Sequence, residues 1–107
     1  MTIGQTARAI GWVMLATATT TLPALAADPH NGERLARRWC AACHVVAADQ
    51  RQTTGEAPPF ESIANKHDFD QGRLAYFLLD PHPKMPDMSL TRFEAADLSA
   101  YIASLGK

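Results

Sequence analysis

Apolar residues recur at helical spacing along most of the chain after residue 28, starting with a stretch from about Pro29 to Cys43. Four apolar positions fall at i, i+4, i+7 and i+8, which is one face of a helix: Leu35, Trp39, Ala42 and Cys43. Asp28 is suited to cap this helix, and a proline fits its first turn. The pattern predicts a first helix that carries two cysteines at its end.

Loops and short helices alternate in the middle of the chain. Residues 45–56 are polar, and the two prolines that follow at 58 and 59 exclude helix there. A short helix is predicted over residues 60–66. A third helix is expected after Asp68 as its cap, with Gln71 at the capping-box position. Its expected buried stripe is Leu74, Phe77 and Leu78.

The last helix has the clearest local signals. Thr91 and Glu94 have the spacing of a capping box. Four apolar residues then fall at i, i+3, i+4 and i+7: Leu98, Tyr101, Ile102 and Leu105. No segment shows the period-two alternation of a strand over a useful length. The sequence therefore predicts an all-α fold of about four short helices.

Residues 1–26 have the organisation of a cleaved signal peptide. Arg8 provides the positive charge, an apolar stretch covers residues 9–18, and Ala24-Leu25-Ala26 has the small-x-small pattern of a cleavage site. An uncleaved membrane anchor is the alternative, but the apolar core is short for a bilayer and Pro23 follows it. We expect cleavage after Ala26, with Ala27 as the second choice, export to the periplasm, and one domain at residues 27–107 without a membrane span.

The pentapeptide Cys40-Ala41-Ala42-Cys43-His44 is the most specific motif of the chain, because CxxCH is the attachment sequence of a c-type haem. Positions three apart on a helix share a face, so both sulfurs can reach one porphyrin. We expect one haem c, bonded covalently through Cys40 and Cys43, with His44 as a ligand of the iron. So small a domain rarely builds a sufficient core unaided, and the haem would supply what is missing.

Other interpretations of the two cysteines are weaker. A zinc site needs a second pair of ligands, and the sequence has only two cysteines. A thioredoxin-like pair would accompany a βαβ pattern, and a structural disulfide is unusual at CxxC spacing. The formal net charge of −1 at pH 7 comes without a basic cluster, so no nucleic-acid partner is expected.

A low-spin electron-transfer haem needs a second axial ligand, and the Pro-rich loop after residue 80 offers two methionines. Met85 is preferred because Pro83 and Pro86 stiffen the backbone that directs its sulfur. Met88 is the second choice. The remaining alternatives are an open coordination position and the histidines His67 and His82.

With these motifs in this order, the chain resembles a small class I cytochrome c over essentially the whole of residues 27–107. The resemblance rests on Gly32 and Leu35, the CxxCH motif, Pro58-Pro59-Phe60, Lys84-Met85-Pro86 and residues 97–102. It implies a cytochrome c fold wrapped around one haem, with Gly32 permitting a close crossing of the first and last helices at Tyr101. It also implies that the Pro58 carbonyl, or that of Pro59, orients His44 and that Met85 is the distal ligand.

Iron bound by both His44 and Met85 has no open position for a substrate, so we expect an electron carrier and not an enzyme. The sequence predicts a monomer that passes one electron between redox partner proteins. The contact would be small and would involve a weakly charged haem edge formed by Ala41, Ala42, Lys84 and Pro86. Two alternatives stay open: an electron-accepting subunit of a dehydrogenase or oxidase, and a ligand-binding or peroxidase-like protein with a labile sixth ligand.

Overall fold

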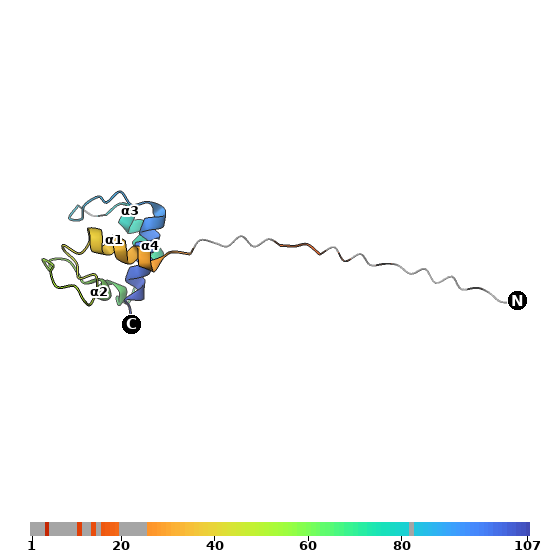
Figure 1. Ribbon diagram of the computed structural model, residues 1–107, viewed down its shortest axis with the longest axis horizontal. Coiled ribbons are helices and arrows are strands. Elements are labelled where there is room, and N and C mark those ends of the chain that lie inside the picture. The colour runs from red at the N-terminus through yellow and green to blue at the C-terminus, as the bar shows by residue number, and fades with distance from the viewer. Residues whose placement is uncertain (1–3, 5–10, 12–13, 15, 20–25, 82) are drawn as a thin grey trace.

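The computed structural model describes residues 4, 11, 14, 16–19, 26–81 and 83–107. Most of the predicted signal peptide, residues 1–26, and His82 lie outside the described residues, so the cleavage site and the domain boundary stay predictions. The helices of the described part are α1 (Pro29–Trp39), α2 (Phe60–Ala64), α3 (Gln71–Leu79) and α4 (Arg92–Ser104), and these residues form no strand (Figure 1). The predicted all-α fold is confirmed. None of these helices combines the length and the apolar character that crossing a bilayer requires.

The close crossing of α1 and α4 forms the centre of the fold, and both α3 and α2 pack against α4 (Figure 1). Gly32 is buried at this crossing. A Cβ atom on Gly32 would lie 2.7 Å from Cβ of Tyr101 and would collide with the carbonyl of Asp97. The carboxylate of Asp97 also accepts hydrogen bonds from the backbone of Asp28 and the side chain of Asn31, at 2.7 and 2.8 Å. The expected approach of the first and last helices at Gly32 is therefore present.

The first helix ends earlier than predicted. Asp28 caps its beginning as expected, but the last helical residue is Trp39 and the C-cap is Cys40. Residues 40–44 instead form a turn in which the amides of Cys43 and His44 both donate to the carbonyl of Cys40, at 3.2 and 2.9 Å. The helix stops here because the next carbonyls along the chain bond to the loop that follows, so they cannot continue the helical ladder.

The third helix begins later than predicted, and its cap is Asp70, not Asp68. The carboxylate of Asp70 accepts a hydrogen bond of 2.7 Å from the amide of Arg73, and its own backbone is extended. Just before it, the amide of Phe69 donates to the carbonyl of Lys66 and closes a turn. That turn occupies the residues that a helix starting after Asp68 would need.

The burial of α4 follows the predicted stripe better than that of α3. Both halves of the capping box between Thr91 and Glu94 are formed, and the apolar residues of α4 include the buried Leu98, Tyr101 and Ile102. In α3, Leu78 is buried but Phe77 is 38% exposed. The reason is that α3 packs against α4 and against no other described helix, so only a narrow stripe is covered.

Candidate functional site

An apolar cavity of about 370 Å³ opens beside the C-terminal end of α1. The long connections before α2 and before α4 both reach this side of the molecule (Figure 1). The cavity has the size of an ordinary ligand site. All five residues singled out in the sequence line it: Cys40, Cys43, His44, Pro58 and Met85. The fold therefore brings together three segments that are far apart in the chain.

Two contacts position His44. Its Nδ1 lies 2.6 Å from the carbonyl oxygen of Pro58, and its ring centroid is 5.2 Å from that of Phe60 with the planes tilted by 52°. A carbonyl can only accept, so Nδ1 carries the hydrogen and donates it. In the neutral imidazole this leaves the lone pair of Nε2 available for a metal. Of the two prolines named above, it is Pro58 whose carbonyl contacts the ring.

Two methionines line the cavity, not one. Met85 is half-buried and Met88 is 8% exposed, and both come from the loop before α4. The structure thus keeps both thioethers within reach of one site. His67 is exposed and is not among the lining residues, while His82 is not described.

The cysteines differ in their surroundings, and they form no disulfide with each other. Cys40 is buried, and this burial raises the pKa of its thiol to about 11. Cys43 is exposed at the cavity.

The loop between the motif and α2 folds back over the motif and bonds to its carbonyls. The amide of Thr54 donates to the carbonyl of Ala42, and that of Ala57 to the carbonyl of Cys43, at 3.0 and 3.3 Å. The Gln50 side chain bonds to the carbonyls at either end of this stretch. Sequence reasoning missed Gln50, because one glutamine in a polar loop carries no periodic or motif signal.

Trp39 lies beside the cysteines, in keeping with the predicted helix face that carries Trp39 and Cys43. It lies in the cavity wall, is 40% exposed, and has Cζ of Arg38 5.0 Å from its ring centroid.

The donor set suits a covalently bound haem. It offers two free thiols at CxxC spacing, an imidazole whose Nε2 can bind iron, and a thioether, all around one apolar cavity. A fold of short helices whose connecting loops line such a cavity defines a monohaem cytochrome c.

Comparison with known proteins agrees with this class. The chain is 53% identical to cytochrome c-552 of Bradyrhizobium diazoefficiens over 93 residues, which cover 87% of this chain and 89% of that protein. This chain belongs to the class I c-type cytochromes. No family model matches it, and no solved structure does. The protein contains covalently bound haem c with its iron and is an electron-transfer protein, a carrier rather than an enzyme.

Proposed function

We propose that this cytochrome is a periplasmic one-electron carrier in which His44 and Met85 bind the iron and Cys40 and Cys43 form the two thioether bonds. The observation that carries the proposal is the hydrogen bond from His44 Nδ1 to the Pro58 carbonyl, made within a cavity that Met85 also lines. That bond leaves Nε2 as the only ring atom able to coordinate a metal.

The haem, when bound, supplies the one-electron redox change of its iron. The protein's contribution is to hold the two axial groups still. The Pro58 carbonyl fixes the plane of His44 and raises the basicity of Nε2, and the contact with Phe60 restricts rotation of the ring. The thioether of Met85 favours Fe(II) more than a second imidazole would, which raises the reduction potential. If His44 and Met85 both bind the iron, they would leave no coordination position for a substrate, and the haem would supply one-electron transfer alone.

A periplasmic location is supported by the signal-peptide pattern of residues 1–26 and by the chemistry of covalent haem attachment, which in bacteria is completed outside the cytoplasm. The test is to express the full chain in a bacterium that matures c-type cytochromes and to determine the mass of the periplasmic product. A mass equal to residues 27–107 plus one haem is expected. Recovery of the whole chain with the membrane fraction would contradict the proposal.

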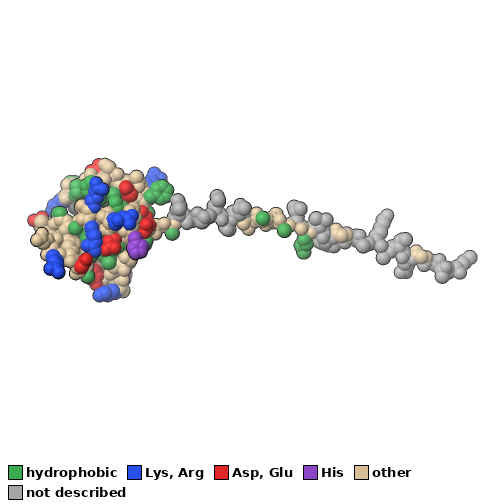
Figure 2. Space-filling model, viewed as in Figure 1, with side chains coloured by type: hydrophobic (Ala, Val, Ile, Leu, Met, Phe, Trp, Pro, Cys, Tyr) green, Lys and Arg blue, Asp and Glu red, His purple; other side chains and the backbone are tan. Residues whose placement is uncertain are grey.

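The proposed redox partners meet the protein at the haem edge around Ala42 and Pro86, both of which are exposed. On the face drawn in Figure 2, acidic and basic side chains are interspersed and do not gather into one patch of a single sign. A contact of this kind is expected to be small and transient, with weak electrostatic steering.

The ligation is tested by the visible absorption spectrum of the reduced haem protein before and after addition of carbon monoxide. The unsubstituted protein is expected to show no change, and Met85→Leu is expected to bind carbon monoxide. Leucine has nearly the same volume as methionine but no sulfur, so packing is largely kept. Met88→Leu is the matched control, because Met88 lies in the same loop and the same cavity.

Each other outcome would replace part of the proposal. Carbon monoxide binding by Met88→Leu alone would make Met88 the ligand. Binding by the unsubstituted protein would show an open or weakly held position, and the ligand-binding alternative would then be preferred to simple electron transfer.

A further inference from the structure

We propose that Gln50 is a positioning residue for the axial histidine, because its side-chain amide holds the backbone of the haem motif at Ala41 and His44 and the backbone just after it at Val46. This inference rests on the proposed role of His44 as an iron ligand. It concerns a residue in the loop between α1 and α2 that does not itself line the cavity.

Both ends of the Gln50 amide are used. Its Nε2 donates to the carbonyl of Ala41 at 2.8 Å and to that of His44 at 2.9 Å, with the carbonyl of Gln52 at 3.0 Å as a third acceptor. Its Oε1 accepts a hydrogen bond of 2.7 Å from the amide of Val46. One half-buried side chain thus connects the second residue of the motif, the histidine, and the residue two positions beyond it.

Backbone amides donate hydrogen bonds to only some of the carbonyls in and just after the haem motif, and Gln50 donates to others. Within the described residues, the carbonyls of Ala42, Cys43 and Val45 accept from the backbone amides of the loop and of Phe60. The carbonyls of Ala41 and His44 accept from Gln50 instead. Their loss would leave the carbonyls of Ala41 and His44 and the amide of Val46 without these partners, and each group that stayed buried would destabilise the backbone near the site.

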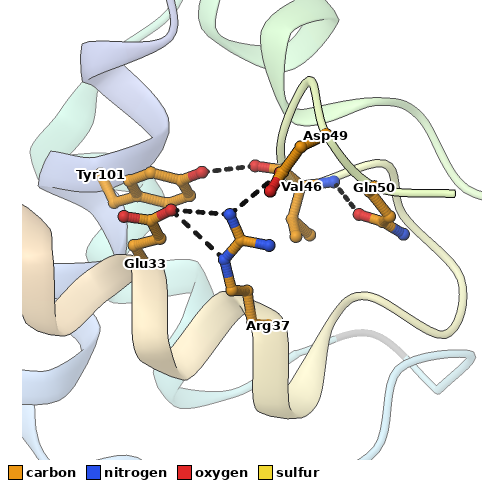
Figure 3. Close-up of polar contacts among 6 residues, drawn as sticks. All are labelled: Glu33, Arg37, Val46, Asp49, Gln50 and Tyr101. Atoms are coloured by element: carbon orange, nitrogen blue, oxygen red, sulfur yellow. Dashed lines mark hydrogen bonds and ion pairs between the residues drawn. The ribbon is translucent and has the colours of Figure 1, made fainter.

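Gln50 can hold the motif in place because two neighbouring residues of its loop are bonded to the central helices, Val46 to α4 and Asp49 to α1. The hydroxyl of Tyr101 in α4 donates to the carbonyl of Val46, at 2.6 Å. Asp49, next to Gln50, forms an ion pair with Arg37 of α1 at 3.0 Å, and Arg37 also pairs with Glu33. Figure 3 shows these contacts together. The backbone amide of Val46 donates to Gln50 on one side, and the carbonyl of Val46 accepts from Tyr101 on the other.

The direction in which the imidazole of His44 leaves the backbone depends on the peptide units that Gln50 holds. If these units are released, the Nδ1 bond to the Pro58 carbonyl is no longer aligned as well, and the imidazole becomes a less basic ligand. A less basic ligand stabilises Fe(III) less, so the reduction potential rises. The ring orientation also becomes less uniform.

The experiment compares the haem-loaded protein with Gln50→Glu, Gln50→Met and Gln52→Ala. Glutamate keeps an acceptor for the Val46 amide but cannot donate to the carbonyls of Ala41 and His44. Methionine has similar length and makes neither kind of bond. Gln52 is an exposed glutamine of the same loop and serves as the control.

Three quantities are measured: the reduction potential, the pattern of haem-methyl proton shifts in the oxidised protein, and the hydrogen-exchange rate of the Val46 amide. Gln50→Met is expected to raise the potential, whereas in Gln50→Glu the added carboxylate favours Fe(III) and opposes that rise. Both variants are expected to change the methyl pattern. Faster exchange at Val46 is expected most clearly in Gln50→Met. Gln52→Ala should match the unsubstituted protein. If Gln50→Glu does not retain haem, Gln50→Met provides the same measurements without a charge beside the carbonyls.

A lower melting temperature with an unchanged potential and methyl pattern in both variants would overturn the inference, since Gln50 would then only support the loop. The proposed function is tested separately in the unsubstituted protein. If that protein shows no strongly shifted ring protons from His44, the ligation itself is wrong, whatever the Gln50 variants do.

Discussion

The hydroxyl of Tyr101 donates a hydrogen bond of 2.6 Å to the carbonyl of Val46, which lies 55 positions earlier in the chain. The bond joins the C-terminal helix to the segment that directly follows His44. Val46 is 1% exposed and Tyr101 is 7% exposed, so water cannot easily replace either partner. This polar contact therefore couples the core of the fold to the haem side of the molecule.

Removing this hydroxyl is expected to destabilise the protein. Tyr101→Phe keeps the ring but leaves the Val46 carbonyl without its donor, which should lower the free energy of unfolding by about 1–3 kcal/mol. Urea denaturation measures the loss. Tyr76→Phe is the matched control, because Tyr76 is 79% exposed and its change should have little effect. Equal effects of the two substitutions would show that the bond to Val46 contributes nothing.

The raised pKa of the Tyr101 hydroxyl predicts that the stability of the protein decreases at alkaline pH. Burial, with a smaller contribution from the carboxylate of Glu33, raises the pKa of Tyr101 above its ordinary value of 10.0. The unfolded chain then loses this proton at lower pH than the folded protein does. The stabilisation is complete below about pH 10 and decreases as the pH rises toward the folded-state pKa. Melting temperatures across this range should fall more for the unsubstituted protein than for Tyr101→Phe, and parallel curves would contradict the prediction.

The crossing of α1 and α4 predicts strong sensitivity at Gly32. A methyl group there would press on Tyr101 and on the backbone of Asp97, so the helices must separate. Gly32→Ala should cost about 1–3 kcal/mol or more in unfolding free energy. Gly72→Ala in α3 is the control, since its nearest neighbour is a side-chain oxygen at 3.4 Å. That control should be neutral or slightly stabilising because alanine favours helix, and a tolerated Gly32→Ala would argue against the close crossing.

Ser99 offers a substitution that should stabilise the protein. It is fully buried in α4, and its Oγ has no hydrogen-bond partner among the described residues. Ser99→Ala removes this unpaired group and should raise the unfolding free energy by about 1 kcal/mol.

Ser104→Ala is the comparison for this prediction, because it gives the same change in helix propensity at the end of the same helix. The hydroxyl of Ser104 donates to the Tyr101 carbonyl at 2.5 Å, so its removal deletes a bond that is made. The melting temperature of Ser99→Ala should therefore be higher than that of Ser104→Ala. A loss of stability in Ser99→Ala would mean that its hydroxyl has a partner in the haem-loaded protein.

The interspersed surface charges predict weak dependence of electron transfer on ionic strength. Stopped-flow oxidation and reduction with one anionic and one cationic metal complex should give rate constants that change little between low and high salt. Steep slopes of opposite sign for the two reagents would reveal a charged haem edge. The docking surface would then have to be assigned to charged residues.

Local signals in the sequence were sufficient for several features. The capping box of Thr91 and Glu94 begins α4 where expected, because both partners lie within one helical turn. The last helix buries Leu98, Tyr101 and Ile102 of its predicted stripe, while Leu105, its C-cap, is half-buried. The first helix was predicted too long, since nothing local indicates that the carbonyls after Cys40 bond to a loop more than ten residues away. The cap of α3 was misplaced because Asp68 and Asp70 are both good capping residues, and the preceding turn at Phe69 selects between them.

By itself, the sequence determined the helical class, the haem and its covalent attachment motif, because these depend on spacings of a few residues. Only the tertiary structure decided that Pro58 rather than Pro59 faces His44, that both Met85 and Met88 reach the cavity, and that Gln50 spans the motif. These contacts join residues whose separation is set by the paths of two long loops. A loop's path follows from which backbone groups find partners across the whole fold, and neighbouring residues alone do not specify it.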